Sequence, residues 1–347
     1  MTQGYASNGR TFGSTTNSSG AWVRNPEWLP LSVTAPEQKV QILCAVWNNG
    51  SNHIAFTFTG AITVDWGDGS APENVSSGVK AQHNLSYAGC DAGSLTSLGY
   101  RQAVVTITPQ SGHNLVSADF SVRTSLIGQR YCDGFLDVTM SAPNMTSLSF
   151  SSYSTISHGM MEQVTILGTT GLASGVSIFW SCNGLRAIAG TAWCSSISDF
   201  TNMFYGCSSL QSVPAFDTSA GTNFTAMFQT CSSLQSVPAL DTSAGTNFTS
   251  MFQNCSSLQS VTLDTSASTN TGYMFYGCVS LQSVILTGLT RGVSVANGSL
   301  SGTALDALYT SLGTAAGAQT ITVSGNPGTG GDTPSIATGK GWTVSGS

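Results

Sequence analysis

The chain has 347 residues, 40% of them hydrophobic, so it can bury a core and is long enough for two or three domains or one elongated repeat body. Only 7% of residues are charged, whereas about 25% is usual. The net charge of −6 includes no Lys/Arg cluster that would neutralise phosphates, which argues against nucleic-acid binding. A polar surface of Ser, Thr, Gly, Asn and Gln is typical of proteins that work outside cells.

The N-terminal segment does not look like an export signal. Residues 1–20 have no basic start and no run of about 7 to 15 apolar residues, and no segment reaches the roughly 18 apolar residues of a membrane span. A surface typical of extracellular proteins, on a chain that is made in the cytoplasm, is what we expect of a virus particle protein that is released by cell lysis. A chain whose signal has been removed also fits. We therefore expect an exposed position on a virion, synthesis in the host cytoplasm without a signal peptide, and no membrane insertion.

The first third of the sequence predicts an arm followed by a β-sandwich. Residues 1–35 are rich in Gly, Ser, Thr and Asn, and we interpret them as an arm that is flexible unless it docks, which makes it a candidate docking segment. Residues 36–112 contain short β-rich runs between Gly, Asn and Pro turns, at 40–43, 54–58, 62–66 and 103–107. Runs with this spacing predict a small antiparallel, Ig-like sandwich.

Residues 113–347 are predicted to form a solenoid, with regular repeats at about 180–286. Weaker copies of the strand pattern occur near residues 115, 137 and 165. The segments 213–236 and 237–260 differ at only three of 24 positions, and the repeated cysteines step by 25, 24, 24 and 23 residues from Cys182 to Cys278. A single unit cannot bury its apolar residues, whereas stacked units bury them as continuous ladders.

Each repeat carries the same apolar set, counted here from its cysteine. Phe stands at position −3, Leu at +3 and Val or Ile at +6, and in four repeats Met precedes the Phe. We interpret all of these as core, with a strand at the Val position of each repeat adding to the next. Asp217, Asp241 and Asp264 suit turns in which the carboxylate accepts backbone N–H bonds. A ladder of aspartates that attracts counter-ions is the alternative.

The C-terminal cap, about 287–347, differs in type from the repeats. Leu305, Leu308, Tyr309 and Leu312 have helical spacing, with Thr303 as a candidate N-cap and Gly313 just past the end. Strands are expected near 320–323 and 342–344. Divergent, helix-containing end units are typical of capping repeats. The fold class is therefore mainly β, with short helices in the cap.

Two segments resemble known families. The string Asn-Phe-Thr-x-Met-Phe-x-x-Cys-Ser-Ser-Leu-Gln-Ser-Val, followed by Asp-Thr-Ser, resembles the BspA-like leucine-rich repeat over about 180–286 and more loosely over 113–180. The C-terminal block looks like the terminus of phage-borne members. Residues 64–70, Val-Asp-Trp-Gly-Asp-Gly-Ser, resemble the signature of polycystic-kidney-disease-type (PKD) sandwiches. These resemblances imply adhesion, recognition or virion assembly, and no enzyme.

The sequence offers no catalytic motif and no cofactor site. The four histidines, His53, His83, His113 and His158, have no metal-ligand spacing, and the nucleophile-elbow and P-loop patterns are absent. Asp65 and Asp68 could bind calcium in the turn they share, but two carboxylates are few, and a hydrogen-bonded turn is the alternative. Five of the nine cysteines recur once per repeat and are interpreted as buried core thiols: Cys182, Cys207, Cys231, Cys255 and Cys278. The alternative is disulfide formation, with Cys44, Cys90 and Cys132 as the first candidates.

Several functions remain open at this point. The first is a non-enzymatic phage tail-fibre or spike component that recognises a host-surface glycan or protein, with other virion proteins bound through the arm or the sandwich. The alternatives are a capsid decoration or tail-accessory protein, and a bacterial cell-surface adhesin; a homo-oligomer is compatible with each. The candidate contact residues are repeated polar positions, for which a solvated ladder without a ligand is the alternative. They are Gln211, Gln235, Gln259 and Gln282 between the Leu and Val positions, and Tyr205, Gln229, Gln253 and Tyr276 between the Phe and Cys positions.

Overall fold

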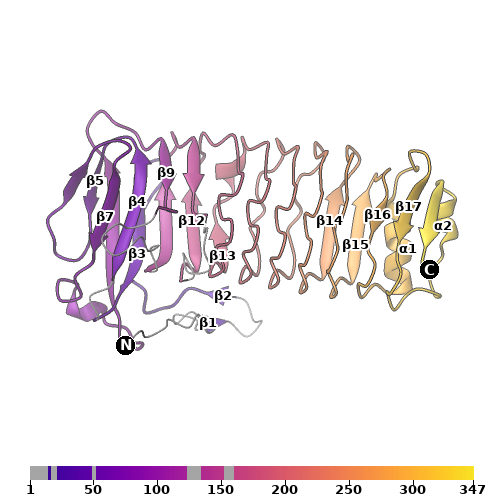
Figure 1. Cartoon of the computed structure of the whole chain (residues 1–347), viewed down its shortest axis with the longest axis horizontal. Coiled ribbons are helices and arrows are strands. Elements are labelled where there is room, and N and C mark those ends of the chain that lie inside the picture. The colour runs from indigo at the N-terminus through magenta and orange to yellow at the C-terminus, as the bar shows by residue number, and fades with distance from the viewer. Residues whose placement is uncertain (1–14, 17–21, 49–51, 123–133, 152–159) are drawn as a thin grey trace. The chain divides into compact units, whose positions relative to one another are not determined.

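The computed structural model describes residues 15–16, 22–48, 52–122, 134–151 and 160–347 (Figure 1). The described chain is mainly β, with two α-helices, and it divides into two compact units. The first unit contains residues 1–170 and 182–189, and the second contains residues 171–181 and 190–347. Within the described residues no helix combines the length and the apolar composition needed to cross a bilayer.

The first unit is built from two β-sheets. Its larger sheet has the strand order β13-β12-β10-β3-β8-β5-β6, and its smaller sheet has the order β11-β9-β4-β7. The larger sheet comprises β3 (Lys39–Val46), β5 (Ile62–Asp65), β6 (Glu73–Val75), β8 (Arg101–Pro109), β10 (Phe135–Ser141), β12 (Gln163–Leu167) and β13 (Ala187–Ala189). The smaller sheet comprises β4 (His53–Thr59), β7 (Lys80–Asn84), β9 (Ser117–Asp119) and β11 (Ser147–Ser149). A short pair, β1 (Thr15–Thr16) with β2 (Trp22–Val23), and a 3-10 turn, η1 (Ala92–Ser94), complete the unit.

Strand direction changes along the first unit. Strand β3 pairs antiparallel with β8, as β5 does with β8 and β4 with β7, which confirms the antiparallel pairing predicted for residues 36–112. Strand β12 pairs parallel with both β10 and β13, and β11 pairs parallel with β9. Parallel pairing is what successive coils of a solenoid produce. Both sheets contain strands from either side of residue 112. The domain boundary expected at that residue therefore stays a prediction.

Aromatic side chains fill the space between the two sheets. Phe56 of β4 contacts Trp66, just after β5, with ring centroids 5.7 Å apart, and Phe120 contacts Phe135 of β10 at 6.2 Å. All four side chains are at most 1% exposed. The alternation of β4, Ile54-Ala55-Phe56-Thr57-Phe58, places both of its phenylalanines on this inner face because successive strand residues point to opposite sides.

The outer face of the larger sheet is covered by the segment that follows β2. Trp28 is buried there against Leu43, Tyr100 and Leu136, and its indole N–H donates to the Tyr100 hydroxyl at 3.0 Å. Arg24 forms an ion pair with the buried Asp137 at 2.7 Å. The described part of the predicted arm, from residue 22 onwards, is therefore docked on its own unit. Residues 1–14 and 17–21 of that arm lie outside the described residues.

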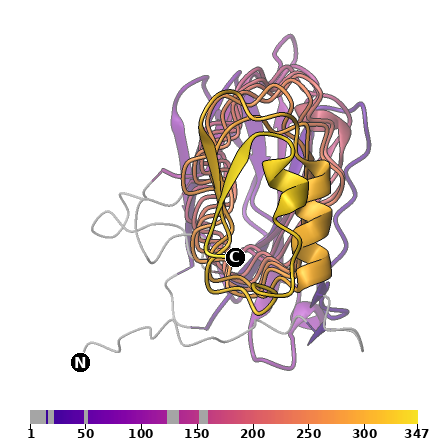
Figure 2. The ribbon, with the colours of Figure 1, turned by 90° about the vertical axis from the view of Figure 1, so that its right-hand side faces the viewer.

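The second unit is a β-solenoid whose coils superimpose in the view along their stacking direction (Figure 2). Each coil is tied to the next by backbone bonds at the same position, for example from the Phe204 N–H to the Met227 carbonyl and from the Phe228 N–H to the Met251 carbonyl, both 2.9 Å. Because the coils have nearly equal length, the same hydrogen bond recurs between each coil and the next.

The core of the solenoid consists of columns of identical side chains. Phe204, Phe228 and Phe252 stack face to face with centroid distances of 5.5 and 5.7 Å, and Phe179 and Phe275 continue the column at its two ends. The methionines that precede four of these phenylalanines are at most 1% exposed. The interpretation of Phe and Met as core is confirmed.

Regular strands are fewer than the repeats predict. Strands β14 (Ser260–Asp264) and β15 (Ser283–Thr287) pair in parallel, but in the preceding coils the corresponding segments contain Pro214 and Pro238 and form no regular strand. There Ser236 and Ser260 form an isolated bridge instead of a regular ladder. Proline has no N–H to donate to a ladder. The prediction of a strand at the Val position of each repeat is therefore wrong for these two coils.

The C-terminal cap contains helix α1 (Gly302–Ser311), helix α2 (Ser335–Thr338) and a parallel sheet of β16 (Val293–Ser294), β17 (Gln319–Thr322) and β18 (Trp342–Ser345). The predicted apolar stripe of α1 is buried, at most 3% exposed. The predicted N-cap, Thr303, is wrong: Ser301 caps the helix by accepting the Ala304 N–H at 3.2 Å. Thr303 lies in the first turn, one residue after the helix begins at Gly302. A short 3-10 turn, η2 (Ala192–Cys194), lies at the other end of this unit.

Candidate binding surface

Two left-handed residues in each coil shape the outward surface of the second unit. Position −5 has a positive φ in every regular coil, at Ser177, Asn202, Ala226, Ser250 and Tyr273. Position −1 does too, at Ser181, Gly206, Thr230, Asn254 and Gly277. Between them the chain buries the Phe at −3 and turns the residue at −2 away from the core. The same backbone in each coil thus aligns the −2 side chains in a row.

This row, here called the aromatic–amide row, consists of the −2 residues Trp180, Tyr205, Gln229, Gln253 and Tyr276. Trp180 stacks on Tyr205 with ring centroids 6.1 Å apart and an interplanar angle of 24°. The side-chain amide of Gln229 donates to the side-chain carbonyl of Gln253 at 3.0 Å. Tyr276 is 62% exposed, whereas the other four residues of the row are half-buried. The structure therefore brings four of the predicted contact residues into one row and adds Trp180 to it.

The other predicted residues form a second row, here called the glutamine row. Gln235, Gln259 and Gln282 are exposed and Gln211 is half-buried. Their backbones form a ladder in which each N–H donates to the carbonyl of the previous coil's glutamine, at 3.2, 2.9 and 2.8 Å. The backbone at these positions is thus used in stacking the coils, and only the side chains remain for a ligand.

Two further exposed residues extend the aromatic–amide row at its last coil. Tyr273 is 70% exposed and meets Tyr276 edge-to-face with ring centroids 6.3 Å apart, and Val279 is 53% exposed. Sequence reasoning missed Tyr273 because the other coils have Ser, Asn or Ala at its position. It missed Trp180 as well, although Trp180 occupies the same −2 slot as Tyr205.

The repeated coils carry almost no charge. Between residues 200 and 290 the only charged residues are Asp217, Asp241 and Asp264. Each accepts the backbone N–H and the hydroxyl of the serine two residues later, at Ser219, Ser243 and Ser266. Hydrogen bonds from Ser243 lower the pKa of Asp241 below its usual value. The predicted turn role of these aspartates is confirmed, and neither the aromatic–amide row nor the glutamine row contains a charged side chain.

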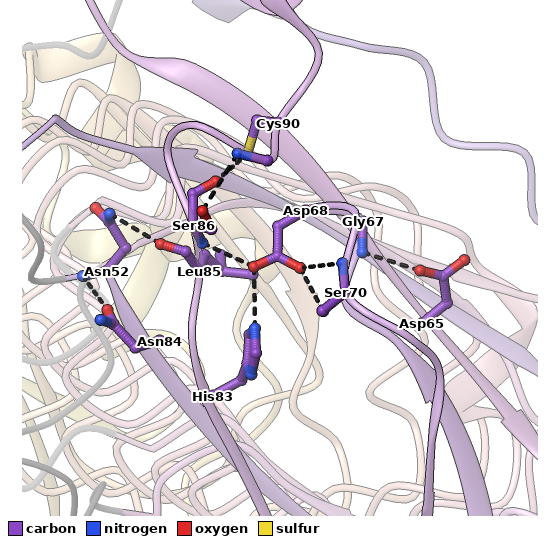
Figure 3. A network of polar contacts seen from close by, with 11 residues as sticks. Asn52, Asp65, Gly67, Asp68, Ser70, His83, Asn84, Leu85, Ser86 and Cys90 are labelled. Carbon is purple, nitrogen blue, oxygen red and sulfur yellow. Dashed lines mark hydrogen bonds and ion pairs between the residues drawn. The ribbon is translucent and has the colours of Figure 1, made fainter.

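The candidate calcium ligands lie in a network of hydrogen bonds in the first unit (Figure 3). Asp68 is buried and accepts bonds from the Ser70 hydroxyl at 2.5 Å, the Ser86 N–H at 2.7 Å and the His83 ring at 2.9 Å. Although burial by itself raises the pKa of Asp68, these bonds lower it below its usual value. Asp65 accepts the Gly67 N–H at 3.0 Å, so it does not share a partner with Asp68. The contacts of both carboxylates are those of a structured turn.

The repeated cysteines are buried, and their thiols help to stack the coils. The thiols of Cys231, Cys255 and Cys278 each donate to the carbonyl of the phenylalanine one coil earlier, at 3.0 Å in each case. Burial raises the pKa of Cys278 to about 12. Thiols with such a pKa stay protonated and are poor nucleophiles at neutral pH. Cys44 and Cys90 are buried as well, whereas Cys132 lies outside the described residues.

Comparison with known proteins matches the repeats alone. A family model described as "Mycoplasma protein of unknown function, DUF285" matches residues 177–287, about a third of the chain. The matched segment coincides with the coils that carry the Phe column, the cysteine thiols and both outward rows. Both the match and the solenoid fit a BspA-like repeat protein. No curated protein matches the chain.

Proposed function

We propose that the chain is a non-enzymatic recognition protein on the exposed surface of a virion, as part of a bacteriophage tail fibre or spike that binds the host surface. The observation that carries this proposal is the aromatic–amide row, which presents side chains at a regular interval on a surface without charge. Exposed aromatic side chains in a polar setting favour binding because they bring large contact area at a low cost in conformational entropy.

The core beneath the row supports this role. The Phe column and the backbone bonds between coils hold each −2 residue in place before a ligand arrives. Binding a ligand then costs the protein little conformational entropy. Weak contacts that are repeated along successive coils add through avidity. A loose loop with the same side chains would lose much of this advantage. The row is therefore better suited to recognition than to a purely solvated ladder.

We further propose that the repeats are leucine-rich in type and that residues 36–112 form a PKD-like sandwich serving as a spacer or attachment module for other virion proteins. The glycines of the Trp-Gly-Asp-Gly turn support this assignment. Gly67 has φ +68°, and a Cβ there would lie 2.4 Å from the Val104 carbonyl oxygen. The turn thus packs directly on strand β8. Glycine is required at position 67 because the two backbones approach closely and because φ is positive there.

Adsorption of the purified full chain to candidate host cells tests this proposal. Fluorescently labelled protein should bind the cells that support infection, and unlabelled protein should reduce infection by the particle. A variant with charges in the row, Gln229→Glu with Gln253→Glu, should lose adsorption. The matched control, Gln235→Glu with Gln259→Glu in the glutamine row, should keep it. If the wild-type chain neither adsorbs nor competes, or if antibody labels only the capsid lattice of the particle, the proposal fails.

A further inference from the structure

We propose that the ligand of the aromatic–amide row is an uncharged glycan chain that lies across the coils and contacts an aromatic site at each end of the row. One site is the Trp180–Tyr205 pair, and the other is the Tyr273–Tyr276 pair. Gln229 and Gln253 lie between them. This inference rests on the proposed recognition function and assigns the chemical class of the ligand.

The Tyr273–Tyr276 pair is difficult to explain as part of the fold. Both rings are more than half exposed, so neither contributes to the core. Tyr273 also adopts φ +57°, a conformation that is uncommon and unfavourable for a bulky residue, whereas the equivalent residues in the other coils are small. An exposed ring in such a position lowers the stability of the fold and is not offset by burial in the core. Binding provides a reason for its presence, since exposed apolar surface next to polar residues is typical of ligand sites.

The Trp180–Tyr205 pair presents the same chemistry three to four coil steps away. Its rings stack at 24° across two adjacent coils and are both half-buried, so their exposed parts form one continuous aromatic surface. Val176, 45% exposed, lies on the same first coil. Coils spaced about 4.8 Å apart place Tyr205 roughly 14 Å and Trp180 roughly 19 Å from the coil of Tyr273 and Tyr276. The row is therefore long enough for several sugar rings.

The residues between the aromatic sites suit hydroxyl groups. The Gln229–Gln253 bond uses one donor of Gln229 and the acceptor of Gln253. The carbonyl oxygen of Gln229 and the side-chain N–H groups of Gln253 then have no further partner within the described part of the chain. A side-chain amide offers both donors and acceptors, as sugar hydroxyls do. The weakly polar C–H face of a sugar ring can in turn cover an aromatic face.

The charge of the surface indicates which class of polymer can bind to it. An anionic polysaccharide or a nucleic acid would need Lys or Arg to replace its counter-ions. Residues 180–290 contain a single one, Arg186, which forms an ion pair with Glu162 at 3.6 Å. A basic peptide would need carboxylates, and the three aspartates of residues 200–290 are held in turns by their own serines. An uncharged glycan needs stacking and amide hydrogen bonds, which are what the row provides.

Competition with fractionated envelope material tests the inference. Cells that adsorb the full chain are extracted, digested with protease, and separated by anion exchange into neutral and acidic polysaccharides. The neutral fraction should displace the bound protein, and periodate treatment of the cells should abolish adsorption. If only the acidic fraction competes, or if adsorption survives periodate but is lost after protease, the ligand is not an uncharged glycan and the inference is overturned, while the proposed recognition function stands.

Substitutions locate the two sites on the protein. Tyr276→Ala and Tyr205→Ala should each weaken binding to the neutral fraction about tenfold, the scale of one lost stacking contact. Tyr276→Phe should retain it because the ring remains. Gln259→Ala in the glutamine row is the matched control and should be unchanged, and hydrogen exchange of the coils verifies folding. Unchanged binding of both alanine variants would overturn the inference.

The two proposals fail in different ways. If no cell adsorbs the chain, the recognition function on a host surface is wrong, and the inference is then decided on immobilised neutral polysaccharides, dextran and mannan among them. If the chain binds one of these polysaccharides and Tyr276→Ala weakens that binding, the glycan inference is supported even though the host-recognition function is not. An absence of binding to all of them would overturn both.

Discussion

Gly245 and Phe248 should be energetically coupled, because the glycine makes room for the phenylalanine ring. A Cβ at Gly245 would lie 2.4 Å from Cζ of Phe248, a distance that real contacts do not reach. The preceding coil repeats the arrangement, with 2.5 Å between a Cβ at Gly221 and Cζ of Phe224. In the next coil both residues change together: Ser268 stands in the glycine slot and Thr271 in the phenylalanine slot. One coil thus pairs a larger residue in the first slot with a smaller one in the second, whereas the coil of Cys207 has Ile197 together with Phe200 in these slots.

A double-mutant cycle measures this coupling. Gly245→Ala alone should destabilise the coil by about 1–3 kcal/mol through overpacking. Phe248→Thr alone should cost about 3–5 kcal/mol for the lost ring, which stacks on Phe224 at a centroid distance of 5.4 Å. With Phe248→Thr present, the shortest contact of Gly245→Ala is gone, but its Cβ would still lie 2.9 Å from the Thr242 carbonyl oxygen and 3.1 Å from Cε2 of Phe224. In this background Gly245→Ala should therefore still cost up to about 1 kcal/mol, the lower end of overpacking.

The expected coupling energy is thus about 1–2 kcal/mol. Alanine is used instead of serine because the buried Ser268 hydroxyl has no hydrogen-bond partner among the described residues. Backbone hydrogen exchange of residues 213–260 gives the local unfolding free energy for each variant, without requiring the whole chain to unfold in one step. If the two substitutions add within about 0.5 kcal/mol, the steric explanation of the glycine slot is refuted.

Three further predictions follow from the described contacts. Phe228→Leu should cost about 0.5–1.5 kcal/mol more than Phe275→Leu, since Phe228 stacks on two rings of its column and Phe275 on one; equal urea midpoints would contradict this. Lys340→Met should destabilise the end of α1 by about 1–3 kcal/mol, because Nζ donates to the carbonyls of Tyr309, Thr310 and Leu312; unchanged amide exchange of α1 would argue against that role. The lowered pKa of Asp68 contributes stability that is present above its ordinary value of 3.8 and is lost as pH falls through the lower folded value. Asp68→Asn should therefore lower stability at neutral pH and flatten the unfolding free energy of the first unit between about pH 5 and about pH 2, whereas a slope equal to wild type would exclude this contribution.

Much of the repeat architecture could be predicted from the sequence because it depends on local periodicity. The interval between cysteines, the Phe at −3 and the Leu at +3 recur in register, and side chains that recur in register can be buried only by stacking. The stripe of α1 and the strands β3, β4, β5 and β8 were predictable for the same reason. Strands β6, β7 and β11 were not, because their short sequences carry little apolar alternation.

The candidate surface was predictable only in part. The −2 slot already identified Tyr205, Gln229, Gln253 and Tyr276 as outward-facing residues by their place between Phe and Cys. The contact of Tyr273 with Tyr276 depends on a left-handed residue, whose side-chain direction is set by the coil and not by sequence spacing. The pairing of Trp180 with Tyr205 depends in the same way on how adjacent coils superimpose.

The sequence by itself determined that the chain stacks repeated units over a core of Phe, Met, Leu and Cys, since these residues recur at a period that no other arrangement buries. Only the tertiary structure decided what the recurring groups contact. It joined the thiols of Cys207, Cys231, Cys255 and Cys278 to carbonyls one coil away, removed the strands at Pro214 and Pro238, and docked Trp28 on the larger sheet. These contacts join residues brought together by the fold, and a pattern along one chain does not contain the distances between such residues.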